Sequence, residues 1–232
     1  MATALIILGA GMGTRMNSEL PKVLHPIGGA PMLVHAMRAG AALSPEKTVI
    51  VAGHGADAVS RAVLAYDPDA QTVLQTEQLG TAHAVAQAKP ALDGFAGDAI
   101  VLYGDTPFIR PETLEAMAAA RREHDIVVLG FEAADAGRYG RLITSGDTLD
   151  RIVEFKDANE EERAVTLCNS GVIAADSTTL FDLIDAVGND NASGEYYLTD
   201  IIAIARARGL SATVVRCDEA ETLGVNSRAE LI

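Results

Sequence analysis

Residues Leu8–Gly29 read LGAGMGTRMNSELPKVLHPIGG, and three glycines, Gly9, Gly11 and Gly13, fall within the first six positions. They directly follow Ala4–Leu8, a short apolar run typical of a strand that is buried on both faces. Backbone N–H groups approach phosphate oxygens closely only where no Cβ intrudes. The segment therefore predicts a phosphate-binding loop at the carboxyl end of the first strand.

Two cations in the same segment, Arg15 and Lys22, fit this interpretation. A guanidinium binds phosphate oxygens in pairs, and an ammonium acts as a mobile point charge. A tight turn carrying two surface cations is the alternative. The sequence lacks the GxxxxGK[ST] pattern of a P-loop. Thr14 stands where a dinucleotide fingerprint needs glycine or alanine, and the second strand ends in VAGHG without the acid that fingerprint requires.

Apolar runs and helical segments alternate at short spacing through residue 131, which predicts βαβ units and a mostly parallel sheet with helices on both faces. The predicted strands are 4–8, 48–51, 72–74 and 99–103, and the predicted helices are 56–65, 81–88 and two that begin near Pro31 and Pro111. The expected fold class is α/β and Rossmann-like.

The pattern changes between residues 131 and 175, where short strand-like pieces at 140–143, 151–155 and 166–174 alternate with glycine and charge. We expect a small antiparallel lobe over the sheet edge, within one domain that spans residues 1–232. Helices are expected again at 179–187 and 198–208, after a polar loop at Val187–Tyr196.

Three glycine-rich or charged segments follow predicted parallel strands: Gly9–Lys22, Gln75–Thr81 and Gly104–Pro107. Ligands of open α/β sheets bind beyond the carboxyl ends of the strands, so these segments are expected to meet at one site. Asp105 in YGDTPFI is placed to hold Mg²⁺, which prefers one or two carboxylates together with phosphates and waters. A carboxylate that caps a turn is the alternative.

Composition excludes several classes of protein. The net charge of −14 argues against a nucleic-acid partner, since such proteins carry a basic face. The two cysteines and five histidines show no metal-binding spacing. No apolar stretch has the ~18 residues needed to span a membrane, and the N-terminus lacks the features of a signal peptide, so the cytoplasm is the expected location.

The segment LGAGMGTRMNSELPKVLHPIGGAPM resembles the signature LxxGxGTRMxSxxPKVLHxxxGxPM of the bacterial N-acetylglucosamine-1-phosphate uridylyltransferase family. Further segments resemble that family in its order along the whole chain: QTEQLGTAHAV, YGDTPFI, GRYGRLI, IVEFKDA, CNSGVI, GEYYLTDII and LGVNSRAEL. The resemblance implies a Mg²⁺-dependent nucleotidyltransferase that makes UDP-N-acetylglucosamine, a precursor for peptidoglycan and lipopolysaccharide in cell wall biogenesis, and pyrophosphate from UTP and N-acetylglucosamine 1-phosphate.

The resemblance also implies the roles of individual residues, position by position. Arg15, Lys22 and Asp105 would be catalytic, and Asp105 and Asn226 would hold Mg²⁺. The nucleotide would contact Leu8, Gly9, Ala10, Gly11, Gly13, Gln75, Gly80, Thr81, Tyr103 and Gly104. The amino sugar would contact Gly140, Glu154, Asn169 and Thr199. A related enzyme for another sugar or nucleotide, and a non-catalytic nucleotide-sugar sensor, remain as alternatives.

Two departures from the family are visible. Gly9 stands where the family usually has alanine, which loosens the loop without removing a functional side chain. The sequence ends with RAELI, whereas the family continues into a left-handed β-helix of hexapeptide repeats that carries an acetyltransferase and forms trimers. That acetyltransferase domain is expected to be absent, which leaves the oligomeric state open.

Overall fold

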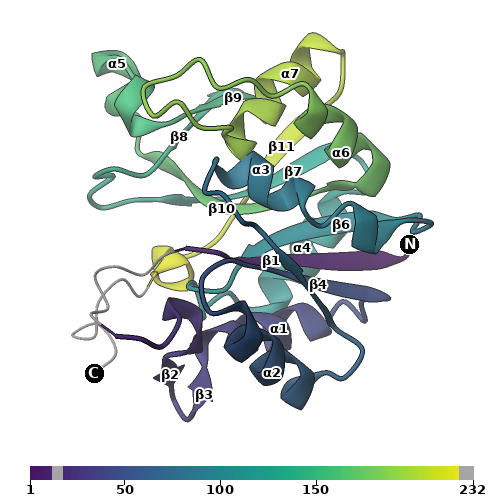
Figure 1. The fold of residues 1–232 in the computed structure, drawn as a ribbon. Coiled ribbons are helices and arrows are strands. Elements are labelled where there is room, and N and C mark those ends of the chain that lie inside the picture. The colour runs from purple at the N-terminus through teal and green to yellow at the C-terminus, as the bar shows by residue number, and fades with distance from the viewer. Residues whose placement is uncertain (12–17, 225–232) are drawn as a thin grey trace.

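The computed structural model describes residues 1–11 and 18–224, and within them nine strands form one mixed sheet (Figure 1). Seven of these strands lie side by side in the order β11 (Ala212–Arg216), β7 (Ile126–Glu132), β10 (Leu167–Asp176), β6 (Asp98–Tyr103), β1 (Thr3–Gly9), β4 (Lys47–Ala52) and β5 (Gln71–Leu74). The β6–β1, β1–β4, β4–β5 and β11–β7 pairs are parallel, and β10 is antiparallel to both of its neighbours. The predicted α/β class with a mostly parallel sheet is confirmed.

Helices cover both faces of the sheet. One face carries α1 (Met32–Ala41), α2 (Ala56–Tyr66) and α4 (Pro111–Ala120). The other carries α3 (Thr81–Ala86), α6 (Ser177–Asp185) and α7 (Ile201–Ala207). Alternate residues of β1 pack into the two cores, Leu5 and Ile7 on one side and Ala4, Ile6 and Leu8 on the other. All of β1 is therefore buried, which explains an apolar run without alternation.

The remaining elements are short. A two-stranded sheet of β2 (Pro26–Ile27) and β3 (Ala30–Pro31) follows the 3₁₀ turn η2 (Lys22–Leu24). Other single turns are η3 (Pro90–Leu92), η4 (Phe155–Asp157), α5 (Glu160–Arg163), η5 (Leu198–Asp200) and η6 (Glu219–Thr222). Among the described residues, no helix is long and apolar enough to cross a membrane.

The antiparallel part differs from the sequence-based prediction in one respect. The hairpin of β8 (Arg141–Ser145) and β9 (Thr148–Val153) extends from the central sheet, as expected, and packs against α7. The segment predicted at 166–174 is not at a sheet edge: it is β10, between β6 and β7 in the middle of the sheet. A strand that joins a hairpin to a central sheet has the same composition as an edge strand, so the pattern did not separate the two. The strands β7 and β11 were not predicted.

Candidate active site

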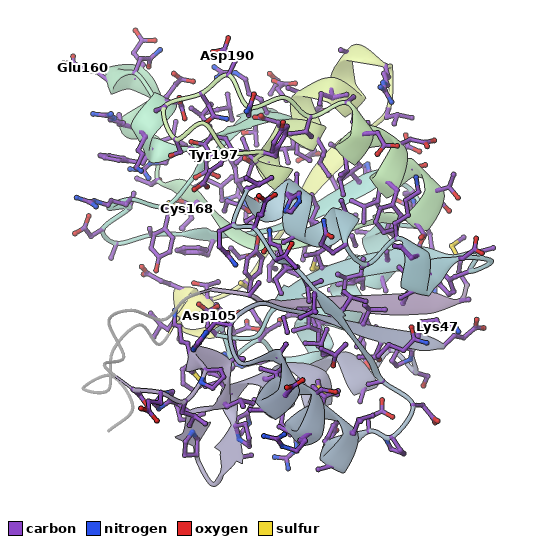
Figure 2. All side chains as sticks on the ribbon, viewed as in Figure 1. Lys47, Asp105, Glu160, Cys168, Asp190 and Tyr197 are labelled. Atoms are coloured by element: carbon purple, nitrogen blue, oxygen red, sulfur yellow. The ribbon has the colours of Figure 1, made fainter. Side chains whose placement is uncertain are left out.

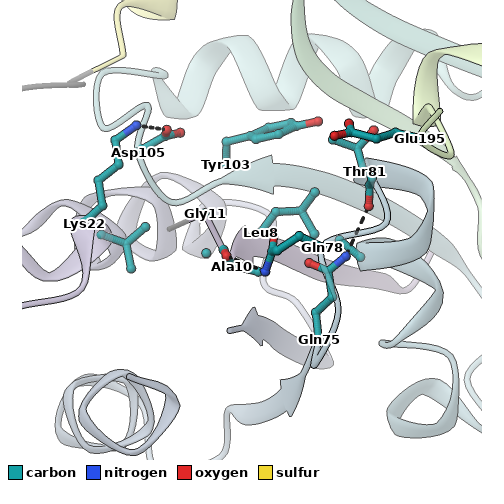
Figure 3. Close-up of a pocket in the computed structure, with 14 residues that line it drawn as sticks. Leu8, Ala10, Gly11, Lys22, Gln75, Gln78, Thr81, Tyr103, Asp105 and Glu195 are labelled. Carbon is teal, nitrogen blue, oxygen red and sulfur yellow. Dashed lines mark hydrogen bonds and ion pairs between the residues drawn. The ribbon is translucent and has the colours of Figure 1, made fainter. Parts of the chain in front are cut away.

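A cavity of about 390 Å³ lies beyond the carboxyl ends of β1, β5 and β6, between the two halves of the molecule (Figure 3). Ten of the residues predicted for nucleotide, metal or catalysis line it: Leu8, Gly9, Ala10, Gly11, Lys22, Gln75, Gly80, Thr81, Tyr103 and Asp105. The strand-end segments therefore meet at one site, as the topology predicts. Their individual roles stay predictions.

Three predicted residues are outside the described part of the chain: Gly13, Arg15 and Asn226. Gly104 is described but does not line the cavity. Its N–H donates to the Leu8 carbonyl, and a Cβ at this position would lie 3.0 Å from Val23 and 3.2 Å from Leu33. The absence of a side chain at Gly104 therefore lets the η2 turn, which carries Lys22, pack closely against it.

The glycines at the end of β1 differ in their surroundings. A Cβ on Gly11 would meet nothing within 4 Å, so this position opens onto the cavity. A Cβ on Gly9 would make only ordinary contacts, the nearest at 3.5 Å, which agrees with alanine being acceptable there. The open space at Gly11 is what close approach of a phosphate to the backbone requires.

Lys22 and Asp105 form the charged centre of the site. The Lys22 Nζ donates to Asp105 Oδ2 at 2.7 Å, with 13% and 30% of the two side chains exposed (Figure 3). Asp105 follows β6 directly, and Lys22 opens the η2 turn after the glycine segment. A cation and a carboxylate at the mouth of the same cavity can neutralise phosphate oxygens and hold a divalent cation, respectively.

Gln75 and Gly80 form a fixed corner of the cavity. The Gln75 side chain is 3% exposed, and its Nε2 donates to the Gly80 carbonyl at 3.2 Å and lies 3.0 Å from His83 Nδ1. Gly80 adopts a positive φ of 116°, and a Cβ on it would lie 2.5 Å from the Tyr196 carbonyl oxygen. Only glycine suits this junction, and within the described part of the chain the Oε1 of Gln75 accepts no hydrogen bond.

The four predicted sugar residues come together beside this cavity: none of them lines it, and Glu154 lines a second cavity that shares Glu195 with the first. The Asn169 N–H donates to the Gly140 carbonyl at 2.9 Å, and the Thr199 hydroxyl donates to Glu154 Oε1 at 3.2 Å. A Cβ on Gly140 would lie 3.6 Å from both Asn169 Cβ and Glu154 Oε1, so the four residues form one cluster. A bulge in β10 after Asn169 turns this residue out of the regular ladder.

Burial raises the pKa of Glu154, and the negative charges of Asp157 and Asp200 raise it further, against the opposing effect of the Thr199 hydrogen bond. Burial likewise raises the pKa of Tyr103, with smaller contributions from Glu154 and Asp105. Tyr103 therefore stays neutral and serves as an apolar surface with a hydroxyl, between Asp105 and Glu195 in Figure 3.

Several residues in or beside the site were not predicted from the sequence, among them Gln78, Gly171 and Glu195. Gln78 lines the cavity and donates to the Ala10 carbonyl at 3.0 Å, which fixes the end of the glycine segment. Gly171 has a positive φ of 93° and leaves room for the Tyr103 ring, which a Cβ would approach to 2.7 Å. Glu195 lines both this cavity and a second one beside Glu154. An Asn-Ser-Gly break inside an apolar strand was the available signal for Gly171.

Away from the sugar cluster, the η6 turn is fastened to the start of α4. The buried carboxylate of Glu221 accepts hydrogen bonds from the Arg110 N–H at 2.9 Å and the Thr113 hydroxyl at 2.6 Å. Both donors belong to the first turn of α4, where an anion is favourable. This contact sets the path of the chain just before residue 225.

Comparisons with known proteins agree with the geometry and with the resemblance seen in the sequence. The chain is 69% identical over 231 residues to the "Bifunctional protein GlmU" of Ruegeria pomeroyi, covering 100% of this chain and 51% of that protein. It is 67% identical over 228 residues to the protein of the same name from Cereibacter sphaeroides, covering 98% and 50%. The chain thus spans about half the length of the curated relatives it matches.

A solved structure with a similar fold is the inositol-1-phosphate CTP transferase from T. maritima, with a TM-score of 0.77, 18% identity, and coverage of 99% of this chain and 91% of that one. Identity at this level shows the fold alone. Residues 5–172 match the MobA-like NTP transferase domain, which is more than half of the 232 residues. The chain therefore belongs to the MobA-like NTP transferase domain family.

Proposed function

We propose that this chain is a uridylyltransferase that forms UDP-N-acetylglucosamine and pyrophosphate from UTP and N-acetylglucosamine 1-phosphate. The observation that carries the proposal is the meeting of two unlike surfaces. One is the glycine-opened surface of the first cavity with Lys22 and Asp105, here called the nucleotide wall. The other is the side-chain cluster around Glu154, here called the sugar wall; Glu154 lines the second cavity, and Glu195 lines both. The identity of 69% to a bifunctional GlmU protein supports the choice of this reaction among those of the family.

On the nucleotide wall, the proposal gives the backbone of Leu8–Gly11 and the Lys22 ammonium to the phosphates of UTP. The corner of Gln75 and Gly80 would receive the base, with the Gln75 oxygen accepting from the uracil N–H. Tyr103 would pack on the ribose side of the ligand. Gly13 and Arg15 keep the roles that the resemblance implies.

A divalent cation fits the donors on this wall. Asp105 offers a carboxylate at the cavity mouth, and Mg²⁺ typically takes one or two carboxylates with phosphate oxygens and waters. Among residues 1–11 and 18–224, no group of three or more His, Cys, Asp and Glu side chains is arranged to hold a metal ion. Asp105 would hold Mg²⁺ with Asn226, and the bound cation would neutralise phosphate charge.

On the sugar wall, the carboxylate of Glu154 would accept hydrogen bonds from ring hydroxyls. The Oδ1 of Asn169 already accepts from the Gly171 N–H at 3.0 Å, which leaves its NH₂ group to donate to the N-acetyl carbonyl. Gly140 gives close backbone approach, and Thr199 orients Glu154 through its hydroxyl.

The reaction needs no general base, because the attacking group is already an anion. A phosphate oxygen of the sugar phosphate attacks the α-phosphorus of UTP in line, a new P–O bond forms, and the α–β bridging bond breaks to release pyrophosphate. The chain contributes alignment of the two substrates and neutralisation of charge by Lys22 and, as the resemblance implies, Arg15. The proposal treats residues 1–232 as one nucleotidyltransferase domain, with the cytoplasm as its expected compartment and small molecules as its substrates.

The test is product formation by the purified chain. UTP and N-acetylglucosamine 1-phosphate with Mg²⁺ are expected to give equal amounts of pyrophosphate and UDP-N-acetylglucosamine, measured by a coupled pyrophosphate assay and by mass spectrometry. Reactions without the sugar phosphate, or with excess chelator, are the controls. Turnover that is faster with glucose 1-phosphate or with dTTP would assign the chain to a different sugar-1-phosphate nucleotidyltransferase. Substrate binding without pyrophosphate release would make it a sensor.

A further inference from the structure

The loop between α6 and η5 makes hydrogen bonds to both the nucleotide wall and the sugar wall. At its C-terminal end the loop is fastened to the nucleotide wall: the Tyr196 N–H donates to the Leu79 carbonyl at 2.8 Å, and the Ala82 N–H donates back to the Tyr196 carbonyl at 2.9 Å. The Leu198 N–H donates to the Thr81 hydroxyl at 2.9 Å. This end of the loop is therefore set by the segment that opens α3.

In its middle the loop is fastened to the sugar wall by two hydrogen bonds to the side chain of Asp157. Its Oδ1 accepts from the Ala192 N–H at 2.9 Å, and its Oδ2 accepts from the Tyr197 hydroxyl at 3.2 Å. The neighbouring Lys156 reaches Ser193 at 3.3 Å. Asp157 binds the loop at two residues, Ala192 and Tyr197, whereas Lys156 binds it at one, Ser193. The Asp157 carboxylate therefore constrains the conformation of the loop between those two residues as well as its separation from the sugar wall.

The turn that carries Asp157 is itself held firmly. The Asp157 N–H donates to the Glu154 carbonyl at 3.0 Å, so the carboxylate and the proposed sugar ligand share one 3₁₀ turn. From behind, the Arg163 guanidinium donates twice to the Phe155 carbonyl and lies 4.3 Å from the centre of the Phe155 ring. Arg163 ends α5, whose Asn159–Glu162 capping box fixes its start. Asp157 thus projects from a rigid base.

A second cavity of about 380 Å³ lies between this base and the loop. Glu154, Phe155 and Lys156 line one wall, and Ser193, Glu195 and Tyr197 line the other. Asp157 does not line the cavity, but its two hydrogen bonds join the walls. Glu195 also lines the first cavity, so a shift of the loop changes the shape of both.

We propose that Asp157 is a positioning residue for the sugar phosphate, which latches residues 188–197 against the η4 turn and so fixes the wall that faces Glu154. The proposal rests on the proposed function for its kinetic consequences. Within the loop, Asn191 makes the remaining side-chain hydrogen bonds, to the backbone of Ser193 and Glu195. Those bonds shape the tip without attaching it to the sugar wall.

The kinetic test compares Asp157→Ala with Asp190→Ala. Asp190 is an exposed carboxylate in the same loop, and its side chain makes no hydrogen bond or ion pair in the described part of the chain (Figure 2). Asp157→Ala is expected to raise KM for N-acetylglucosamine 1-phosphate about fivefold to tenfold, with KM for UTP and kcat changed less than about twofold, because the loop no longer holds the sugar wall. Asp190→Ala is expected to match the wild type. Equal behaviour of the two variants, or an equal rise in both KM values, overturns the proposal.

Asp157→Asn separates the latch from a charge effect. An asparagine oxygen accepts from the Ala192 N–H, and its NH₂ group donates to the Tyr197 oxygen, so both contacts survive without the charge. This variant is expected to recover wild-type KM to within about twofold. If it behaves like Asp157→Ala, the effect comes from the negative charge near Glu154, and the latch is refuted.

A measurement without substrates keeps the latch distinct from the proposed function. Amide hydrogen exchange of residues 188–197 is expected to quicken in Asp157→Ala and to remain at the wild-type rate in Asp157→Asn and Asp190→Ala. Tyr197→Phe is expected to quicken exchange less than Asp157→Ala does, and to add nothing to that variant. Unchanged exchange in Asp157→Ala refutes the latch whatever the enzyme makes, whereas altered exchange in a chain that produces no UDP-N-acetylglucosamine refutes only the proposed reaction.

Discussion

The nucleotide wall and the sugar wall are built from different parts of the sheet and by different means. The nucleotide wall lies at the ends of parallel strands and presents backbone, small residues and one ion pair, Lys22–Asp105. The sugar wall lies on the antiparallel hairpin and the bulge of β10, and presents side chains that hold one another, such as Thr199 and Glu154. Asp105 lies at the junction of the two halves in Figure 2.

This difference predicts how substitutions in each wall affect substrate binding and turnover. Backbone contacts at strand ends cannot be removed by substitution, so on the nucleotide wall mutation tests only side chains, such as the Lys22–Asp105 pair and Gln75. The sugar wall depends on side chains that bind the sugar before and during the reaction, so their loss weakens binding more than it slows turnover. The experiments below test this division.

The largest effect is expected for Asp105→Ala. The change removes the proposed metal ligand and leaves the Lys22 ammonium without its carboxylate at 2.7 Å. We expect kcat to fall by about 10³-fold or more, which corresponds to about 4 kcal/mol of lost transition-state stabilisation. Steady-state kinetics across a range of Mg²⁺ concentrations measures this, with circular dichroism to verify the fold. Near-normal turnover in Mg²⁺ would remove Asp105 from the metal site.

The next effect concerns the choice of base. The Gln75 nitrogen donates to the Gly80 carbonyl, so in the proposed complex the Gln75 oxygen would be the atom that contacts the base. As an acceptor it would oppose the N3 acceptor of cytosine. We expect kcat/KM for CTP to be roughly 30- to 150-fold below that for UTP, or ~2–3 kcal/mol for an unpaired buried polar group.

Two variants sharpen this test of base choice. Gln75→Ala is expected to reduce the difference in kcat/KM between UTP and CTP. Gln87 carries the same amide group in the same region but does not line the cavity, so Gln87→Ala is expected to retain the wild-type difference in kcat/KM. A wild-type enzyme that uses CTP as well as UTP would exclude Gln75 from reading the base.

A smaller effect is expected on the sugar wall. Glu154→Ala is expected to raise KM for N-acetylglucosamine 1-phosphate at least tenfold, about 1.4 kcal/mol, with little change in KM for UTP. The exposed Glu160 of α5 provides the control, because Glu160→Ala removes a nearby carboxylate outside both cavities. If Glu154→Ala instead raises KM for UTP and leaves KM for the sugar phosphate unchanged, the hairpin covers the nucleotide and the two walls have been assigned the wrong way round.

The smallest effect is on stability. Because burial raises the pKa of Glu154 above its ordinary 4.5, the folded state binds more protons than the unfolded state between the two pKa values. Stability contributed by this group therefore falls as pH rises through that window. Glu154→Gln is expected to raise Tm by roughly 2 °C above the window and to leave it unchanged below pH 4.5, as thermal unfolding at several pH values would measure. An equal shift at every pH would mean that the gain does not come from ionisation.

The sequence predicted the nucleotide wall more completely than the sugar wall. Glycines after an apolar run, followed by Lys22, identify a strand end by local pattern, and the parallel topology then brings Gln75 and Asp105 to the same edge. On the sugar wall, Glu154, Asn169 and Thr199 were found by family resemblance, because isolated polar residues in strand-like segments look the same whether they face solvent or a ligand. Gln78, Gly171 and Glu195 escaped both approaches.

By itself, the amino-acid sequence determined the alternation of buried strands and helices, the glycine opening at Gly11 and the charges available to bind phosphate, because these depend on residue type and on neighbours along the chain. Only the tertiary structure decided that β10 runs antiparallel through the middle of the sheet, that Gly80 must lie against Tyr196, and that Asp157 joins two segments. Those contacts unite residues 35 to 116 positions apart, whose approach follows from the packing of whole elements and from no local pattern.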